Sequence, residues 1–600
     1  MSTRFRFATS LILLLLLPLA AMTGCKKHVD YPNVILISID TLRADRLGCY
    51  GYTKGITGMM DFWAERGVRF EKAYATSPWT LPSHASAMTS LYPTEHRAID
   101  EKINIDIDAP MLAEQMKKAG FNTAAFVSHY YLSAEYGFDR GFNDFYIKPN
   151  AKADEMIAKT TKWLKANKDE SFFVFLHLFD PHTPYQPPPD YAKKHYPTDT
   201  KVYVSGETKD VIEVMQTWPS ERAKEIKRAL SALYDGEIDF VDNQLEVLFK
   251  WLQQNKLDQN TVIILMADHG EEFMEHGMME HGFTLYEEQV RVPFLWYFPA
   301  GLPGGKVVDA PVSLVDLMPT LLDFLGLPPV DQPISGKSLM PAIKGEPFPD
   351  RYLLTETTRQ GPDRVSIIKD GLKYMYSPEF ALNGRTFGEF LFNLKDDPAE
   401  ETDLMPSEPD VAGKLSGELF SSGLYIQRRA WHVRWGQAPK PVRIRGQIGA
   451  TPGKFIYIYK ANTIYGTDER GLMTSLEYPL DKKDPQKLQF LALCERDNGV
   501  SFMTEPETGP VAFHFFVEGR EQTRNILLGN KTTHPGSGNF TLSNEIKREP
   551  GLNAPSGGIL IWNEPIWVNS KQILRAEVGD PIQLSPEVIE QLRSLGYLTQ

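Results

Sequence analysis

The sequence predicts an α/β protein with a parallel central sheet, followed by an all-β domain. Three near-continuous apolar runs each end at or near a polar residue, at 33–40, 171–178 and 261–268. Such runs are typical of strands buried on both faces, as in a parallel sheet. Helical patterns alternate with them, at 110–119 (closed by Gly120), 151–168 and 221–254. In such folds, ligands bind beyond the carboxyl ends of the strands, which nominates Asp40, His177 and Asp268 as site residues.

The pattern changes near residue 430, where short apolar runs alternate with Gly, Pro and Asn clusters. This alternation indicates a β-sandwich-like region. We therefore predict a catalytic domain over 31–429, a β-rich accessory domain over 430–584 and a helix over 585–600, which opens with Ser-Pro-Glu. The Pro-rich segment 183–199 is expected to be an irregular loop beside the site.

Length and composition exclude several classes of protein. A chain of 600 residues is longer than one core usually supports, which agrees with more than one domain. With 64 Lys and Arg against 77 Asp and Glu, the net charge of −13 argues against a nucleic-acid partner. Three cysteines exclude a disulfide-stapled scaffold, and Cys49 and Cys494 are either free or paired.

The first residues have the pattern of a targeting segment. Two arginines precede an apolar run over 11–22, which is too short to span a bilayer. The run ends in MTGC and resembles a bacterial lipoprotein box, which implies a signal peptide over 1–24 and a lipid on Cys25. Because Lys26 follows rather than Asp, the resemblance implies a lipid-anchored protein of the cell envelope, in the outer membrane or periplasm if the host is Gram-negative. A plain signal peptide is the alternative.

Four residues form a candidate metal set: Asp40, Thr80, Asp268 and His269. A divalent ion held by oxygens and one imidazole needs such side chains to converge from separate strand ends. Each has a structural alternative on its own, since Asp40 fits a helix cap and Asp268-His269-Gly270 fits a turn. Together they are better explained by a metal.

Thr80 precedes Pro82, which fits the first turn of a helix. A hydroxyl at a helix start meets free N–H groups and a positive dipole, which suit an anionic ester. Metal binding would lower the pKa of the hydroxyl and make Thr80 a nucleophile. The alternative is an ordinary helix cap formed by Thr80 and Ser83.

Histidines cluster in sequence around these residues. His177 and His182 flank a turn, and His276 and His281 follow His269 closely. We expect them to protonate a leaving group or hold a second cation. His84, one helical turn after Thr80, is expected on the same side of its helix, with surface packing as its competing role.

Four ordered motifs resemble the sulfatase family of the alkaline phosphatase superfamily. They are NVILISIDTLRAD, SPWTLPSHAS, FLHLFDPHTPY and ADHGEEFMEHG, and the resemblance covers about residues 31–405. It implies an α/β/α sandwich, with Asp40, Asp268 and His269 as metal ligands. It also places Thr80 at the nucleophile position and His182 against the substrate oxyanion or leaving group.

The departures from that family affect the expected chemistry. Family members usually have Cys or Ser at position 80, which is converted to formylglycine, and Arg at position 84. Threonine cannot give that aldehyde, because oxidation at its branched carbon yields a ketone. Thr41 replaces a usual aspartate and His269 a common asparagine, so zinc or manganese is favoured and calcium remains possible.

With threonine at position 80, the candidate site residues resemble those of phosphoethanolamine transferases and lipoteichoic acid synthases, which use a metal-bound threonine as the nucleophile. The histidines at 177, 182 and 281 match the spacing in the transferases. We therefore expect a metal-dependent hydrolase or transferase that acts through Thr80 on a phosphate ester of a small molecule, lipid or glycan. The alternatives are a sulfuric ester hydrolase and a catalytically degenerate glycan-binding lipoprotein.

Overall fold

The computed structural model describes residues 31–435, except 100, 102, 358, 360–362, 379, 383 and 384, and ten strand segments between 443 and 569. The predicted signal peptide, Cys25, Cys494 and the helix predicted over 585–600 lie outside the described residues. Within the described part, no helix is both long and apolar enough to cross a membrane.

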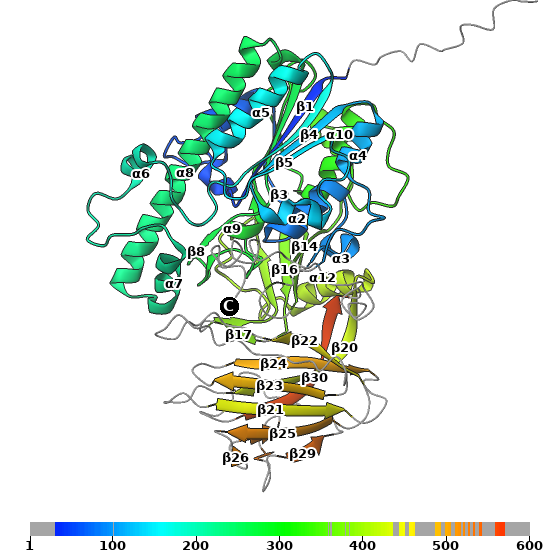
Figure 1. Cartoon of the computed structure of the whole chain (residues 1–600). Helices are drawn as coiled ribbons and strands as arrows, with labels where there is room; N and C mark the ends of the chain where they lie inside the picture. The colour runs from blue at the N-terminus through cyan, green and yellow to red at the C-terminus, as the bar shows by residue number, and fades with distance from the viewer. Residues whose placement is uncertain are drawn as a thin grey trace, which may run out of the picture.

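An eight-stranded sheet lies at the centre of the larger part of the chain, in the order β12-β2-β11-β7-β1-β6-β4-β5 (Figure 1). Strands β7, β1, β6, β4 and β5 run parallel, and β1, β6 and β7 are buried throughout. This burial on both faces explains the continuous apolar runs and confirms the predicted α/β class. The strands are β1 (Asn33–Ile39), β2 (Val68–Phe70), β4 (Asn122–Val127), β5 (Asp144–Ile147), β6 (Phe172–Leu178), β7 (Thr261–Ala267), β11 (Phe294–Tyr297) and β12 (Lys306–Val308).

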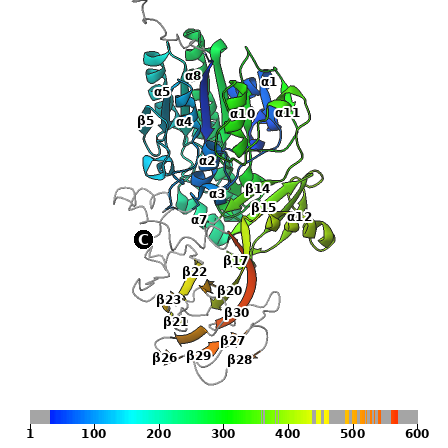
Figure 2. The ribbon, with the colours of Figure 1, turned by 90° about the vertical axis from the view of Figure 1, so that its right-hand side faces the viewer.

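Helices cover both faces of this sheet (Figures 1 and 2). Helices α1, α5 and α8 form one group of contacts, and α2, α4, α10 and α11 form another. Their bounds are α1 (Gly58–Arg66), α2 (Thr80–Thr89), α3 (Pro93–His96), α4 (Leu112–Lys118), α5 (Ala153–Asn167), α8 (Glu221–Gln254), α10 (Leu317–Phe324) and α11 (Met340–Lys344). The three helices predicted from sequence are α4, α5 and α8, whose ends agree within two residues.

One local prediction is wrong. The segment 183–199, expected to be irregular, contains the helix α6 (Pro189–His195). Pro189 occupies the first helical position, where the N–H that proline lacks would have no intrahelical partner. The prolines therefore start this helix instead of preventing it. Helix α7 (Thr208–Thr217) follows, and both helices pack on α8.

A smaller antiparallel sheet, with α12 (Pro409–Ser421) packed on it, extends the larger part of the chain. Its strands are β14 (Leu353–Thr357), β15 (Arg364–Lys369), β16 (Leu372–Tyr376) and β19 (Phe390–Asn393). Short strands complete this part of the chain: β3 (Ala73–Tyr74), β8 (Glu272–Phe273), β9 (Met279–Glu280), β10 (Arg291–Val292), β13 (Val312–Ser313), β17 (Phe380–Leu382) and β18 (Arg385–Phe387), together with helix α9 (Glu287–Val290).

The predicted C-terminal β-rich region is present (Figure 2). One sheet has the order β22-β24-β20-β30-β27-β28, and the other has the order β23-β21-β25-β26 with β29 on β25. The buried rings of Trp431 and Phe513, one from each sheet, lie 5.5 Å apart. The strands are β20 (Tyr425–Trp435), β21 (Arg443–Ala450), β22 (Phe455–Ala461), β23 (Lys487–Leu493), β24 (Asn498–Glu505), β25 (Val511–Val517), β26 (Arg520–Glu521), β27 (Ile526–Leu528), β28 (Thr532–Thr533), β29 (Asn539–Leu542) and β30 (Ile559–Asn569). The domain boundary at 430 stays a prediction.

Candidate metal centre and active site

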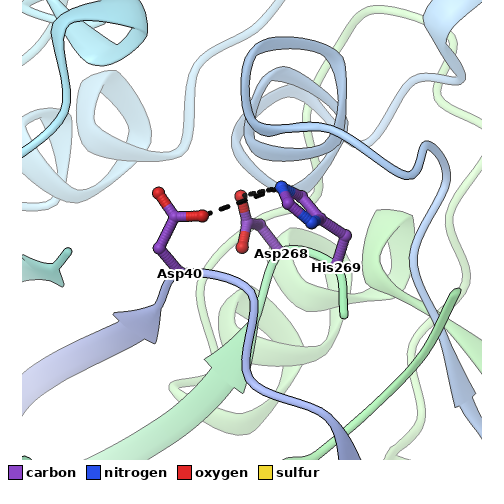
Figure 3. A group of neighbouring side chains, drawn as sticks. All are labelled: Asp40, Asp268 and His269. Carbon is purple, nitrogen blue, oxygen red and sulfur yellow. Dashed lines mark ion pairs between the residues drawn. The ribbon is translucent and has the colours of Figure 1, made fainter. Parts of the chain in front are cut away.

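Two neighbouring parallel strands bring the predicted metal ligands together (Figure 3). Ile39 of β1 pairs with Ala267 of β7, so the next residues, Asp40 and Asp268, leave the sheet side by side. His269 Nε2 lies 3.3 Å from Asp268 Oδ2 and 3.7 Å from Asp40 Oδ1. One ligating atom from each of the three residues lies within 4.8 Å of the others.

The polar atoms of this cluster fit a cation. Asp40 and Asp268 are fully buried, and three of their four carboxylate oxygens have no hydrogen-bond partner. Burial, followed by the charges of Asp268 and Glu271, raises the pKa of Asp40 well above its usual range. Unpaired buried carboxylates are costly unless an opposite charge compensates them. Two carboxylates and one imidazole suit a divalent ion.

Thr80 places a hydroxyl at the edge of this cluster. It is the first residue of α2, it is 1% exposed, and its Oγ1 lies 3.4 Å from His269 Nε2. The N-cap of α2 is Trp79, and Ser83 Oγ donates to the backbone oxygen of Asp268 at 2.6 Å. The capping alternative for Thr80 and Ser83 is therefore wrong, and the helix N-terminus adds a positive potential beside the hydroxyl.

His84 and His177 each lie next to one of the two carboxylates. His84 Nδ1 lies 3.3 Å from Asp268 Oδ2 and 2.9 Å from the backbone oxygen of Thr80. His177 Nε2 lies 3.4 Å from Asp40 Oδ2. Burial, followed by the charge of His84, lowers the pKa of His177 well below its usual range. Both rings are buried beside metal-ligand candidates, which argues against surface packing for His84.

His182 and His281 face each other beside His269. Their ring centres lie 4.9 Å apart, and that of His281 lies 4.5 Å from that of His269. Burial lowers the pKa of His182 to about 3, and burial together with His269 lowers that of His281 well below its usual range. The two imidazoles therefore belong to a row of rings that starts at His269, the residue that contacts the Thr80 hydroxyl, and a proton could be relayed along this row.

Of two further histidines, His276 lies against Tyr286 and Glu288, whereas His129 lies close to His182. His276 stacks on Tyr286 at 3.7 Å and pairs with Glu288 at 3.3 Å, so it braces the fold instead of flanking the ligands. His129, at the end of β4, lies 5.8 Å from His182 between ring centres. It therefore joins the histidine cluster, and its place just after a strand-like segment was the signal in the sequence.

Two further residues of the site were not predicted. Glu271 is fully buried, and its Oε1 lies 3.1 Å from His281 Nδ1. It stands inside the ADHGEE motif, so its position was a usable signal. Arg359 lies over the ring of Trp79, with its Cζ 5.1 Å from the ring centre. Its own segment carries no motif, and only the tertiary fold brings it to the site.

Comparison with known proteins shows which family and which folds the chain is similar to. The Sulfatase family model matches residues 32–327. An arylsulfatase of Clostridium perfringens is 26% identical over 446 residues, covering 63% of this chain and 91% of that relative. A Delta 4,5-hexuronate-2-O-sulfatase of Bacteroides thetaiotaomicron is 25% identical over 435 residues, covering 64% of this chain and 87% of the relative.

Solved structures share the fold. A protein determined in complex with its substrate D-glucosamine-2-N,6-O-disulfate superposes with a TM-score of 0.55, at 19% identity, covering 66% of this chain and 97% of that one. The phosphonate monoester hydrolase of Agrobacterium radiobacter gives a TM-score of 0.54, at 22% identity, covering 65% of this chain and 95% of the other.

The fold and the site define an ester hydrolase of a metal-dependent α/β class. The family model and these relatives support membership of the sulfatase family of the alkaline phosphatase superfamily. The relatives are mostly sulfatases, which favours sulfate over the phosphate ester expected from the sequence.

Proposed function

We propose that this protein hydrolyses a sulfate ester of a small molecule or glycan, with the Thr80 hydroxyl as the nucleophile. One observation carries the proposal: Thr80 Oγ1 stands 3.4 Å from His269 Nε2, beside carboxylate oxygens that lack hydrogen-bond donors. The sulfatase relatives support sulfate as the group removed. The sugar named for the hexuronate sulfatase supports a glycan as the leaving group.

The residues of this chain suit a double displacement. Thr80 Oγ attacks sulfur, the bond from sulfur to the bridging ester oxygen breaks, and a threonine sulfate forms. The hydroxyl proton of Thr80 ends on the leaving oxygen, relayed by the neutral imidazoles of His182 and His281. Water then attacks sulfur, the bond from sulfur to Thr80 Oγ breaks, a proton from the water returns to Oγ, and hydrogen sulfate leaves. Asp40, Asp268 and His269 would hold a divalent cation, which would supply Lewis-acid polarisation and lower the pKa of the hydroxyl.

A phosphate ester is the second candidate, and the identity of residue 80 favours it. Threonine cannot become the formylglycine aldehyde, so the nucleophile must be a hydroxyl, which suits a phospho-threonine intermediate. The same fold is found in a phosphonate monoester hydrolase, so it accommodates chemistry at phosphorus in another protein. The geometry of Thr80 is the same for both candidates.

Turnover of matched esters distinguishes the candidates. Protein comprising residues 28–600, loaded with zinc or manganese, is assayed with p-nitrophenyl sulfate, phosphate monoester and phosphate diester. Sulfate turnover that is lost in Thr80→Ala and kept in Thr161→Ala supports the proposal, since Thr161 lies on α5 away from the site. Phosphate turnover that requires Thr80 supports the second candidate, and activity that survives Thr80→Ala contradicts both.

We propose further that a lipid on Cys25 anchors the protein in the cell envelope. The MTGC sequence after an apolar run supports this location. Fractionation of cells that express the full chain tests it. Wild type is expected with the membranes and Cys25→Ala in the soluble fraction, whereas equal distribution of both contradicts lipid anchoring.

A further inference from the structure

Gln289 is a buried residue that connects the two loops carrying His269 and His281. It lies in the short helix α9, and its side chain is fully buried. Its backbone oxygen accepts a hydrogen bond from the N–H of Gly270 at 2.8 Å, and its Oε1 accepts one from the N–H of Gly282 at 3.0 Å. Gly270 and Gly282 directly follow His269 and His281 in the sequence. One residue therefore holds the backbone next to both histidines.

The two glycines let α9 lie directly against these loops. A Cβ added at Gly270 would overlap the backbone oxygen of Glu288, so a larger residue would push α9 away. Gly282 has a φ of +86°, which residues other than glycine rarely adopt. Thr357 Oγ1 donates to the backbone oxygen of Gly282 at 3.3 Å, so side chains bind both polar groups of its backbone. These contacts fix the chain after His281 to α9 and to the end of β14.

The other end of the Gln289 side chain holds the segment between the two histidines. Gln289 Nε2 donates to Glu272 Oε2 at 3.1 Å, and Thr284 Oγ1 donates to the same oxygen at 2.8 Å. Glu272 Oε1 accepts the backbone N–H groups of His276 and Met278, both at 3.0 Å. Through this carboxylate, the amide of Gln289 also ties the intervening segment to α9.

Helix α9 is itself anchored to the strand that leads to the nucleophile. The N–H of Ala75 donates to the backbone oxygen of Val290 at 2.8 Å, and β10 pairs with β3 directly after α9. The chain runs from β3 to Thr80 at the start of α2. The position of α9 is therefore set relative to Thr80, and Gln289 passes that position on to the loop of His281.

We propose that Gln289 is a positioning residue for His281 and that it acts through the N–H of Gly282. This contact fixes where the imidazole of His281 stands relative to His269, whose ring centre is 4.5 Å away. Proton transfer requires close and aligned partners, so a small displacement of the ring weakens it. The inference rests on the proposed function for the role of His281 in moving a proton to the leaving oxygen.

Two sulfate esters with different leaving groups test this role in the metal-loaded protein. The kcat is measured for glucose 6-sulfate, whose alkoxide leaving group needs a proton, and for p-nitrophenyl sulfate, whose leaving group does not. Gln289→Met keeps the length of the side chain without its polar atoms, and it is expected to lose about tenfold or more for the first ester and less than about threefold for the second. Gln253→Met, at an exposed position near the end of α8, should change neither.

A double variant and a conservative variant separate this role from general damage to the fold. In a His281→Gln background, Gln289→Met should cause little further loss for glucose 6-sulfate, because the residue through which it acts is already gone. Gln289→Glu keeps an oxygen for the Gly282 N–H and, when protonated, an O–H for Glu272, so it should keep the wild-type ratio of the two kcat values within about threefold. Losses that multiply in the double variant, or equal losses for both esters, overturn the proposal.

Amide hydrogen exchange tests the contact without turnover. In wild type, the N–H of Gly282 is expected to be protected like that of Gly270, since both donate to Gln289. In Gln289→Met, Gly282 should exchange at least about tenfold faster, while Gly270, whose acceptor is a backbone oxygen, stays protected. Fast exchange of Gly282 in wild type would overturn the proposal even if the variant does not fold. Failure of the proposed function would show instead as no turnover of either ester by wild type.

Discussion

Replacing Asp40 by Asn removes both a buried negative charge and a metal ligand. The two effects are distinguished by measuring the stability of the protein without and with metal. Both carboxylate oxygens of Asp40 are buried without a hydrogen-bond partner, and Asp268 lies beside them. Burial and the charge of Asp268 raise the pKa of Asp40, so its ionised form destabilises the metal-free protein. A neutral amide of the same size removes that cost. Metal-free Asp40→Asn is therefore expected to be about 1–3 kcal/mol more stable than wild type.

Metal is expected to reverse this order. A ligand that binds only the folded state at a thousandfold excess over Kd adds about 4 kcal/mol. Wild type should gain this stability, and Asp40→Asn, which has lost one of two carboxylates, should gain far less. The advantage of the variant in chelator should also shrink at low pH, because Asp40 is then protonated in both the folded and the unfolded state.

Urea unfolding near neutral pH, with chelator and then with excess zinc or manganese, measures both effects. The free energy of unfolding is compared for wild type and Asp40→Asn under each condition. A wild type that is more stable than Asp40→Asn in chelator would show that the charge of Asp40 is already compensated without metal. An equal gain in stability from metal in both proteins would show that Asp40 is not a metal ligand.

Three other predictions follow from the same structure. Burial raises the pKa of Glu356 to about 7, and ionising it in place costs about 3 kcal/mol, so wild type should lose this stability as pH rises from about 4.5 through about 7. Urea unfolding across that range should show a flatter pH dependence in Glu356→Gln, and an unchanged slope would contradict the assignment. Thr80→Ser keeps a hydroxyl and should retain kcat within about tenfold, whereas Thr80→Ala should lose at least about 10³-fold, and equal losses would argue against a nucleophile. His281→Gln should lower kcat by about 10²-fold for an alkyl ester and much less for a p-nitrophenyl ester, because only the poor leaving group needs a proton; identical losses would exclude that role.

The sequence was most informative where burial imposes a simple pattern. The residues of β1, β6 and β7 are buried on both faces, which leaves a continuous apolar run in each. Since parallel strands end at one edge, the convergence of Asp40 and Asp268 also followed from the sequence. Helix α8 was predicted to the residue because its 34 residues keep an amphipathic period.

Other features depend on contacts between distant segments. Arg359 lies near the site only because Thr357, at the end of β14, lies beside Gly282, and no local sequence pattern indicates that contact. His276 and His281 are five residues apart, yet one stacks on Tyr286 and the other faces His182. Helix α6 differs from the sequence prediction because the prolines, which usually break a helix, lie here at the positions where a helix begins.

The central claim is that Thr80 forms a covalent ester with the group removed from the substrate. Rapid acid quenching during turnover, followed by accurate-mass analysis of the peptide that contains residue 80, tests this most directly. We predict an added sulfuryl group on Thr80, absent in Thr80→Ala, and a phosphoryl mass would select the second candidate. An unmodified Thr80 under conditions where product forms in a burst would contradict the account, because the nucleophile would then be water or another side chain.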